Sequence, residues 1–169
     1  MPRKAQPKPK AARPELVNPG ELGEELVAQW LQKKGWTVLE RRWHSRWGEL
    51  DLIVARMGQS PPNLPISLAF VEVKARSRNN WDSQGALAIS AQKQTKLWKT
   101  AQLFLVAHPD LAELPCQFDV ALVSCRKLGL QRLPIAQPAD PVFSADCTSL
   151  TAAGYHLVLL DYIQAAFVL

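Results

Sequence analysis

Asp51, Glu72 and Lys74 are ionisable residues inside two strongly apolar stretches of the 169-residue sequence. Asp51 lies in GELDLIVAR (48–56) and the other two lie in FVEVKARSR (70–78), both typical of buried strands. Adjacent carboxylates are unfavourable to bury unless a cation or a proton compensates. Carboxylate oxygens suit Mg²⁺ or Mn²⁺, which binds phosphate and activates water. These residue types predict phosphodiester hydrolysis, with Asp51 and Glu72 as metal ligands and Lys74 beside the nucleophilic water.

Strand geometry determines whether these side chains can meet. Side chains alternate faces along a strand, so Asp51 and Ile53 are predicted to share one face, as are Glu72 and Lys74. If the two strands pair with these faces aligned, two carboxylates and one ammonium group meet at one edge of a sheet. A structural ion pair between Lys74 and a carboxylate is the alternative explanation. The apolar setting favours the metal site, because a surface ion pair does not require it.

A helix that could bring a third carboxylate to this edge is predicted from Pro19 to Lys34. Its apolar residues recur with a period of about 3.6 residues, Asn18 suits the N-cap, and Gly35 suits the stop. Glu24 borders the apolar arc and is therefore predicted to lean toward the sheet. Its alternative role is that of a favourable acid in the first turns of a helix.

The remaining pattern predicts an α/β sandwich with a central mixed sheet. Strands are expected at 36–43, in ELDLIVA and in SLAFVEVKA, forming an antiparallel meander whose last two strands are separated by a proline-containing loop. A second helix is expected from Ser90 to about Val106. One strand at 117–125 and another near the C-terminus follow, whereas 126–155 contains prolines, shows no clear period and is expected to be irregular.

Composition and charge restrict the class of protein. Residues 1–17 are rich in Pro, Lys and Ala and are predicted to be a disordered basic arm, with residues 18–169 forming a single domain. Residues 33–99 hold 12 basic and 5 acidic side chains, a local charge of +7 that favours a nucleic-acid partner. No apolar stretch reaches the roughly 20 residues that span a bilayer, and no secretory signal is present. With three cysteines and no CxxC pattern, the expected location is the cytoplasm, without a membrane partner.

Basic and aromatic residues near the site strands are candidates for nucleic-acid contacts. Arginine binds phosphate with two parallel hydrogen bonds, and an exposed tryptophan can stack on an unpaired base. In the alternative, the arginines form a solvated rim and the tryptophans pack in the core. The candidates are Arg42, Arg46, Arg76 and Arg78, with Trp43, Trp47 and Trp81 between them.

These motifs resemble the YraN-like family of small, largely uncharacterised bacterial proteins. The resemblance covers roughly residues 20–124 and the last few residues, through GEELVAQWLQKKGWTVLERRW, GELDLI, FVEVKARSR, QGALAISAQKQTKLWKTAQLFL, FDVALV and YIQAAF. That family is similar to the PD-(D/E)xK nuclease superfamily, whose restriction-endonuclease-like fold includes archaeal Holliday-junction resolvases. The resemblance therefore implies an α/β/α sandwich in which helices flank a central mixed β-sheet.

The resemblance also implies roles for single residues. It implies that Glu24 is a helix carboxylate that assists catalysis and that Asp51 and Glu72 hold the metal. Lys74 corresponds to the catalytic lysine. Lys93 matches a lysine of the family and is expected to contact a backbone phosphate.

Two features depart from the family pattern. The insertion GQSPPNLPI between the site strands is expected to lengthen a surface loop. Gln117 stands where arginine is usual before Phe118-Asp119-Val120, which is expected to remove a partner for a phosphate or a carboxylate. Asp119 itself is expected to be structural or to support the site indirectly.

The predicted function is that of a Mg²⁺- or Mn²⁺-dependent endonuclease acting on DNA at branched or single-stranded regions. A homodimer is expected by analogy with the resolvases. Two alternatives stay open: a non-catalytic nucleic-acid-binding protein of the same fold, and an interaction protein in which Glu72 and Lys74 form a structural ion pair. A binder would show steep salt dependence without needing Mg²⁺, whereas an interaction protein would show no affinity for nucleic acid.

Overall fold

Helix α1 (Pro19–Lys33) begins and ends where its sequence predicts. In this computed structural model, the Asn18 side chain accepts a hydrogen bond from the Gly20 backbone N–H at 2.9 Å and caps the helix. Gly35, just past the end, has φ +82°, a conformation that glycine adopts without strain. The apolar side of the helix is fully buried at Leu26, Val27, Ala28 and Leu31.

The structure describes residues 18–59, 62–77, 89–129 and 141–167. The predicted basic arm (1–17), Arg78 and Trp81 lie outside these ranges, so the predictions made for them stay predictions. Within the described ranges, neither of the two α-helices has the length and hydropathy needed to cross a membrane.

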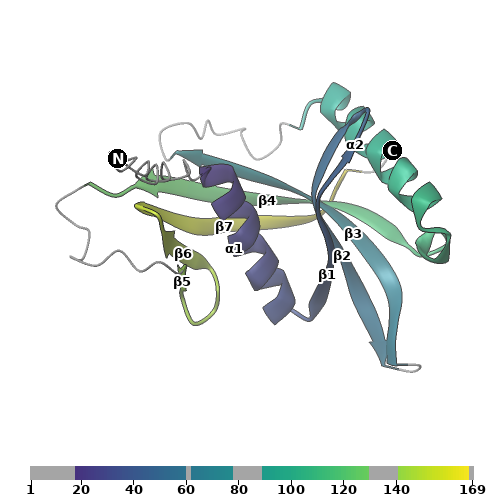
Figure 1. Cartoon of the computed structure of the whole chain (residues 1–169), viewed down its shortest axis with the longest axis horizontal. Coiled ribbons are helices and arrows are strands. Elements are labelled where there is room, and N and C mark those ends of the chain that lie inside the picture. The colour runs from purple at the N-terminus through teal and green to yellow at the C-terminus, as the bar shows by residue number, and fades with distance from the viewer. Residues whose placement is uncertain (1–17, 60–61, 78–88, 130–140, 168–169) are drawn as a thin grey trace, which may run out of the picture.

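Seven described strands form one mixed sheet, in the order β1-β2-β3-β4-β7-β6-β5 (Figure 1). The first three pair antiparallel and form the predicted meander: β1 (Trp36–Ser45), β2 (Gly48–Gln59) and β3 (Pro62–Ser77). The chain then continues into α2 (Ala91–Ala107), which Ser90 caps by accepting a hydrogen bond from the Lys93 backbone N–H. A single 3-10 turn, η2 (Pro109–Leu111), follows α2.

The second half of the sheet begins with β4 (Cys116–Lys127), which pairs parallel with β3. Antiparallel pairing then adds β7 (Tyr155–Phe167), β6 (Ser149–Ala152) and β5 (Val142–Phe143). The parallel pair requires a crossover, and α2 lies in that crossover. The sheet is therefore mixed, as predicted.

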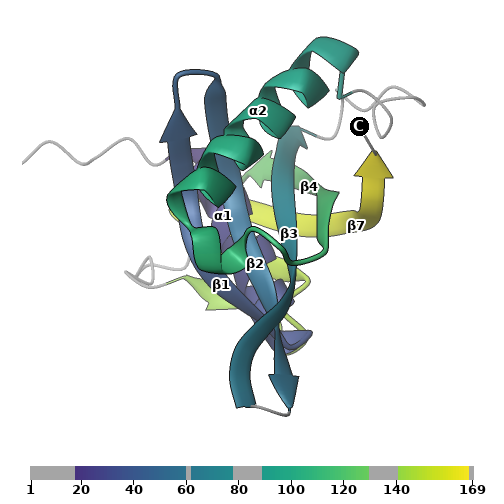
Figure 2. The same cartoon turned by 90° about the vertical axis from the view of Figure 1, so that its right-hand side faces the viewer.

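The two α-helices cover opposite faces of the sheet. One buried cluster joins α1 to Leu52, Val54, Val71 and Val123, and the other joins α2 to Ile53, Ala55, Phe70 and Val120. Figure 2 shows α2 lying across β1 and β2 on the face opposite α1. This arrangement confirms the predicted α/β fold with a central mixed sheet flanked by helices, and it is consistent with a nuclease-like sandwich.

Two segments expected to be loops contain strands. Pro62 and Pro65 lie within β3, and the β2–β3 hairpin extends to a pairing between Gln59 and Pro62. The register shifts on both sides of Met57, where the ladder is irregular enough to accept residues that lack an N–H. The range 126–155 includes the end of β4 and the short β5–β6 hairpin, whose strands are too brief to produce a readable period.

Asp119 joins β7 to the middle of the sheet. It is fully buried on β4 and accepts hydrogen bonds from the Tyr162 hydroxyl at 2.7 Å and the Ala165 backbone N–H at 2.9 Å. The Gln117 side-chain amide also donates to it at 2.9 Å, so glutamine supplies a neutral partner where the family pattern has arginine. Burial, together with the negative charge of Asp119, holds the pKa of Tyr162 far above its ordinary value. These contacts support the structural interpretation of Asp119.

Replacing Tyr162 with phenylalanine is expected to lower the free energy of unfolding by about 1.5 kcal/mol, because a hydrogen bond to a charged group contributes about that much. The ring contact with Trp30, at 4.9 Å between centroids, would remain. Urea unfolding followed by tryptophan fluorescence measures the loss. Tyr155→Phe is the control, because within the described residues its hydroxyl makes no hydrogen bond. Equal losses in the two variants would contradict the role given to Asp119.

Candidate active site

The candidate site lies where β2 and β3 stop pairing. The ladder between them ends at Leu52 and Val71. Beyond that point β2 continues with β1 as far as Gly48, and β3 continues with β4 as far as Ser77. The strands therefore separate, as Figure 2 shows, and Asp51 and Glu72 are the first residues past the last pair.

Asp51 occupies the opening between the two strands. Its Oδ2 accepts a hydrogen bond from the Val73 backbone N–H at 2.7 Å, in place of the ladder bond that a backbone carbonyl would make. Burial and then the neighbouring charge of Glu72 raise the pKa of Asp51 to about 6, although the Val73 N–H and Lys93 oppose the rise. The ionised carboxylate is therefore incompletely compensated by the chain.

Only one of the two carboxylate oxygens of Glu72 has partners among the described residues. The side chain is 5% exposed, and its Oε1 lies 2.6 Å from the Lys74 Nζ and 3.1 Å from the Lys93 Nζ. Its Oε2 is buried and has no hydrogen-bond partner among the residues that the structure describes. Buried carboxylate oxygens nearly always have a partner, so this atom is suited to bind an added cation.

Glu24 approaches the same opening from α1. Its side chain is 18% exposed. Burial raises its pKa to about 7, and the negative charge of Asp51 is the second cause. The Arg42 Nε, 3.9 Å from Glu24 Oε2, works in the opposite direction. The structure thus brings the helix carboxylate into electrostatic contact with Asp51, as the apolar arc of the helix predicts.

Arg42 is oriented by an unusual backbone conformation. It has φ +52° and lies between the pairs Arg41–Leu52 and Trp43–Leu50, opposite Asp51. Positive φ is uncommon outside glycine and is often found at functional sites. The guanidinium lies 2.6 Å from Glu21 and 3.1 Å from Glu49, besides its contact with Glu24, so it is engaged by carboxylates of its own chain rather than free for a phosphate.

The reversed backbone of β1 at Arg42 lies opposite a break in the alternation of side chains between the two faces of β2. Leu50 packs under α2 together with Ile53, whereas Leu52 packs under α1. The alternation predicted along β2 is therefore broken between Leu50 and Leu52. The break lies opposite Arg42, whose φ is positive, and at this point Asp51 interacts electrostatically with both Glu24 of α1 and Glu72 of β3.

The profile of the Uncharacterised protein family UPF0102 matches residues 23–123, a segment that contains all four proposed metal-binding and catalytic residues. The chain belongs to the UPF0102 family. This confirms the resemblance to the YraN-like family.

Cyanobacterial UPF0102 proteins are similar to this chain over most of its length. The relative from Acaryochloris marina is 48% identical over 183 residues, covering 100% of both chains. Those from Trichodesmium erythraeum (45% over 163 residues, 90% of each chain) and Nostoc sp. (46% over 151 residues, 89% of this chain and 94% of the relative) are similar along nearly the whole protein. The names of these relatives state the family and no activity.

The other predicted contact residues of this UPF0102 protein lie around the opening in different environments. Arg46, near the β1–β2 turn, is exposed, and its guanidinium carbon lies 5.2 Å from the ring centroid of Trp47. Trp47 is 38% exposed and also contacts Lys99, at 4.3 Å from Nζ to the centroid. Trp43 packs edge-on against Phe104 in the core. Of the two described candidates for base stacking, Trp47 is the accessible one.

Lys93 is predicted to contact a backbone phosphate, and in the structure its side chain contacts a carboxylate of the site itself. It lies in the first turn of α2, and its Nζ reaches Glu72. The Ser90 cap fixes where α2 begins, but the docking of α2 on the sheet decides that Lys93 reaches Glu72. Glu49 was not predicted to take part, yet it contacts both Arg42 and His44, with its Oε1 3.3 Å from the His44 Nε2.

The donor set of the UPF0102 site is suited to a hard metal that keeps much of its water. Within the described ranges, no three Asp, Glu, His or Cys side chains are arranged to hold a metal ion. Asp51 and Glu72 offer two carboxylates, which is the usual protein contribution to Mg²⁺ when waters and substrate phosphate fill the remaining positions. The buried, unpartnered Oε2 of Glu72 and the raised pKa of Asp51 both fit an added cation.

Proposed function

We propose that this UPF0102 protein is a divalent-metal-dependent nuclease that hydrolyses phosphodiester bonds in DNA. The observation that carries the proposal is the buried oxygen of Glu72, which has no partner in the described part of the chain and lies beside a second carboxylate whose ionised form is also poorly compensated. Asp51 and Glu72 would hold Mg²⁺ or Mn²⁺. A metal bound there supplies charge neutralisation at the phosphate and a more acidic water.

The side chains around the two carboxylates have complementary roles. Lys74 is 26% exposed, so its ammonium can reach a substrate while staying paired with Glu72, and it would stabilise negative charge that develops on the phosphate. Glu24 has a pKa of about 7, which suits a group that takes up a proton from water near neutral pH. The Val73 N–H keeps Asp51 in place.

The surroundings of the site support DNA as the substrate. Residues 33–99 carry the local charge of +7, and Arg46 is exposed within that range. Trp47 is accessible beside Arg46 and Lys99, a combination that binds unpaired bases by stacking and phosphates by charge. Branched or single-stranded regions are therefore the expected targets.

The contact between Lys74 and Glu72 also favours one alternative, an interaction protein with a structural ion pair. That alternative accounts for one oxygen of Glu72 and leaves the other oxygen and Asp51 unexplained. A non-catalytic DNA-binding protein is weaker still, because Asp51 and Glu72 would repel a phosphate without a metal.

Calorimetric titration with Mn²⁺ and Mg²⁺ tests the metal site directly. Binding heat is expected with the intact protein and should be lost in the double variant Asp51→Asn with Glu72→Gln. Asp110→Asn with Glu113→Gln makes the same chemical change at two exposed residues and is expected to bind like the intact protein. Each titration is repeated with an oligonucleotide present, because the substrate supplies ligands in such sites. Absence of binding in both conditions, or equal binding by the site variant, would overturn the proposal.

A further inference from the structure

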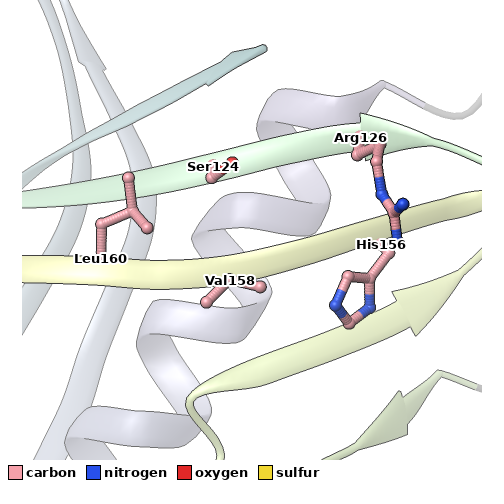
Figure 3. A pocket seen from close by; sticks show the side chains of 5 residues that line it. All are labelled: Ser124, Arg126, His156, Val158 and Leu160. Carbon is pink, nitrogen blue, oxygen red and sulfur yellow. The ribbon is translucent and has the colours of Figure 1, made fainter. Parts of the chain in front are cut away.

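A hollow lies on the half of the sheet that contains β4 and β7, next to the half that carries the candidate active site. It has a volume of about 220 Å³ and is lined by Ser124 and Arg126 of β4 and by His156, Val158 and Leu160 of β7 (Figure 3). Figure 3 shows the Arg126 side chain extending toward His156 on the neighbouring strand, with which it is in register. Leu160 is 53% exposed, so the hollow is accessible.

The hollow and the active site are on the same face of the sheet. Val123, Cys125 and Leu157 pack in the cluster under α1. Residues that alternate with them, including Ser124, Arg126 and His156, therefore face away from α1. Glu72 alternates with Val71, which also packs under α1, so Glu72 and Lys74 face the same way.

Lys74 and Arg76 lie between the two places, on a face that also carries Asp161, the pairing partner of Leu122. In the parallel ladder, Lys74 is opposite Leu122 and Arg76 is opposite Ser124 at the edge of the hollow. Arg126 lies four residues beyond Leu122, about 14 Å from Lys74 when strand rise and strand spacing are combined. Nucleic-acid strands advance about 3.4 Å per nucleotide in a duplex, so this separation spans about four nucleotides.

The chemistry of the hollow suits phosphate. Its described lining residues include a guanidinium and an imidazole but no carboxylate. Among the described residues Arg126 forms no ion pair, in contrast to Arg41 and Arg42, which are paired with glutamates of α1. The His156 Nδ1 lies 3.0 Å from the Thr151 hydroxyl, a contact that orients the ring. Val158 and Leu160 provide an apolar floor that can contact a sugar.

We propose that this hollow is a subsite for the phosphate backbone of a nucleic-acid strand whose scissile bond lies at Asp51 and Glu72. The inference rests on the proposed nuclease function, because that function places the scissile bond of the nucleic-acid strand at Asp51 and Glu72. All five lining residues follow the segment 23–123 that the family profile matches. The C-terminal strands therefore extend the substrate-binding surface beyond the part that carries the catalytic residues.

Fluorescence anisotropy of labelled single-stranded and duplex DNA, measured in EDTA over a range of salt concentrations, tests the subsite apart from catalysis. Arg126→Gln is expected to weaken binding about tenfold, the effect of one charged hydrogen bond. It is also expected to reduce the slope of log K against log salt by about 0.7 to 0.9. Lys127→Gln makes the same charge change one residue later on the opposite face and is expected to bind like the intact protein.

A second variant adds charge instead of removing it. Leu160→Lys places an ammonium group in the hollow and is expected to tighten binding and to steepen the salt slope by about the same amount. Weak binding by Arg126→Gln together with tight binding by Leu160→Lys supports the subsite. If the intact protein does not bind DNA, if Arg126→Gln binds like the intact protein, or if Lys127→Gln is equally weakened, the subsite is overturned.

Cleavage assays on the same proteins separate this result from the proposed nuclease function. Binding that depends on Arg126 but is accompanied by no metal-dependent cleavage would support the subsite and overturn the nuclease. Cleavage that is lost in Asp51→Asn while Arg126→Gln binds like the intact protein would support the nuclease and overturn the subsite.

Discussion

Lys74→Ala is expected to slow metal-dependent DNA cleavage about 10³-fold, the loss found when one preorganised donor is removed from a developing negative charge. The ammonium group of Lys74 is the part of the Glu72 pair that reaches solvent and can contact substrate. Lys93 also contacts Glu72, so the buried carboxylate keeps one cation and the fold is expected to persist. Single-turnover rates at saturating protein measure the loss, and circular dichroism checks the fold.

Lys96→Ala is the matched control for this experiment. Lys96 is exposed on α2, and its removal changes the net charge by the same amount. Cleavage by Lys96→Ala should match that of the intact protein. Metal binding by Lys74→Ala should also persist, because both carboxylates remain. Equal cleavage by the intact protein and Lys74→Ala would remove the lysine from the mechanism.

Without a divalent metal, the protein is expected to lose stability as the pH rises from about 4 to about 7. The pKa of Asp51 is raised from 3.8 to about 6 and that of Glu24 from 4.5 to about 7, chiefly by burial. Between its unfolded and folded pKa, each carboxyl holds its proton in the folded state and has lost it in the unfolded state, so stability falls with pH. For Asp51 the loss is about 3 kcal/mol, complete above its folded pKa.

Asp51→Asn should remove the contribution of Asp51 to this pH dependence, leave the part of the Glu24 contribution that comes from burial, and stabilise the metal-free protein at pH 8, while abolishing cleavage. The amide oxygen of asparagine can still accept the Val73 N–H, so the main change is the removal of a poorly compensated charge. Urea unfolding in EDTA at a series of pH values measures the effect, with Asp110→Asn as the exposed control. An unchanged pH dependence in Asp51→Asn would contradict the electrostatic description of the site. Mn²⁺ should stabilise the intact protein and not the variant.

The local signals in the sequence were sufficient for much of the fold. Asn18 and Gly35 mark the bounds of α1 because capping and positive φ depend on the residue itself. The apolar runs around Asp51 and Glu72 predict paired strands because burial on both faces requires them. The grouping of these carboxylates, with Lys74 alongside, follows from the same pattern, although they meet between the inner strands β2 and β3 rather than at an edge of the sheet.

Features that depend on contacts between distant elements could not be read from the sequence. The reversal at Arg42 requires a left-handed conformation that arginine seldom adopts, and no local residue signals it. The contact between Lys93 and Glu72 depends on how α2 docks on the sheet. The hollow at Arg126 arises from pairing between β4 and β7, whose residues are 30 positions apart at Arg126 and His156.

The separation of β2 from β3 also makes the backbone a spectroscopic reporter of the site. At Val73 the acceptor is the Asp51 carboxylate rather than a peptide carbonyl. The chemical shift of this amide and its rate of exchange with deuterium therefore respond to the ionisation of Asp51 and to ions that compete for its oxygens. Nuclear magnetic resonance of one peptide group can thus follow the charge state of the candidate site, without any label or substitution in the side chains that form it.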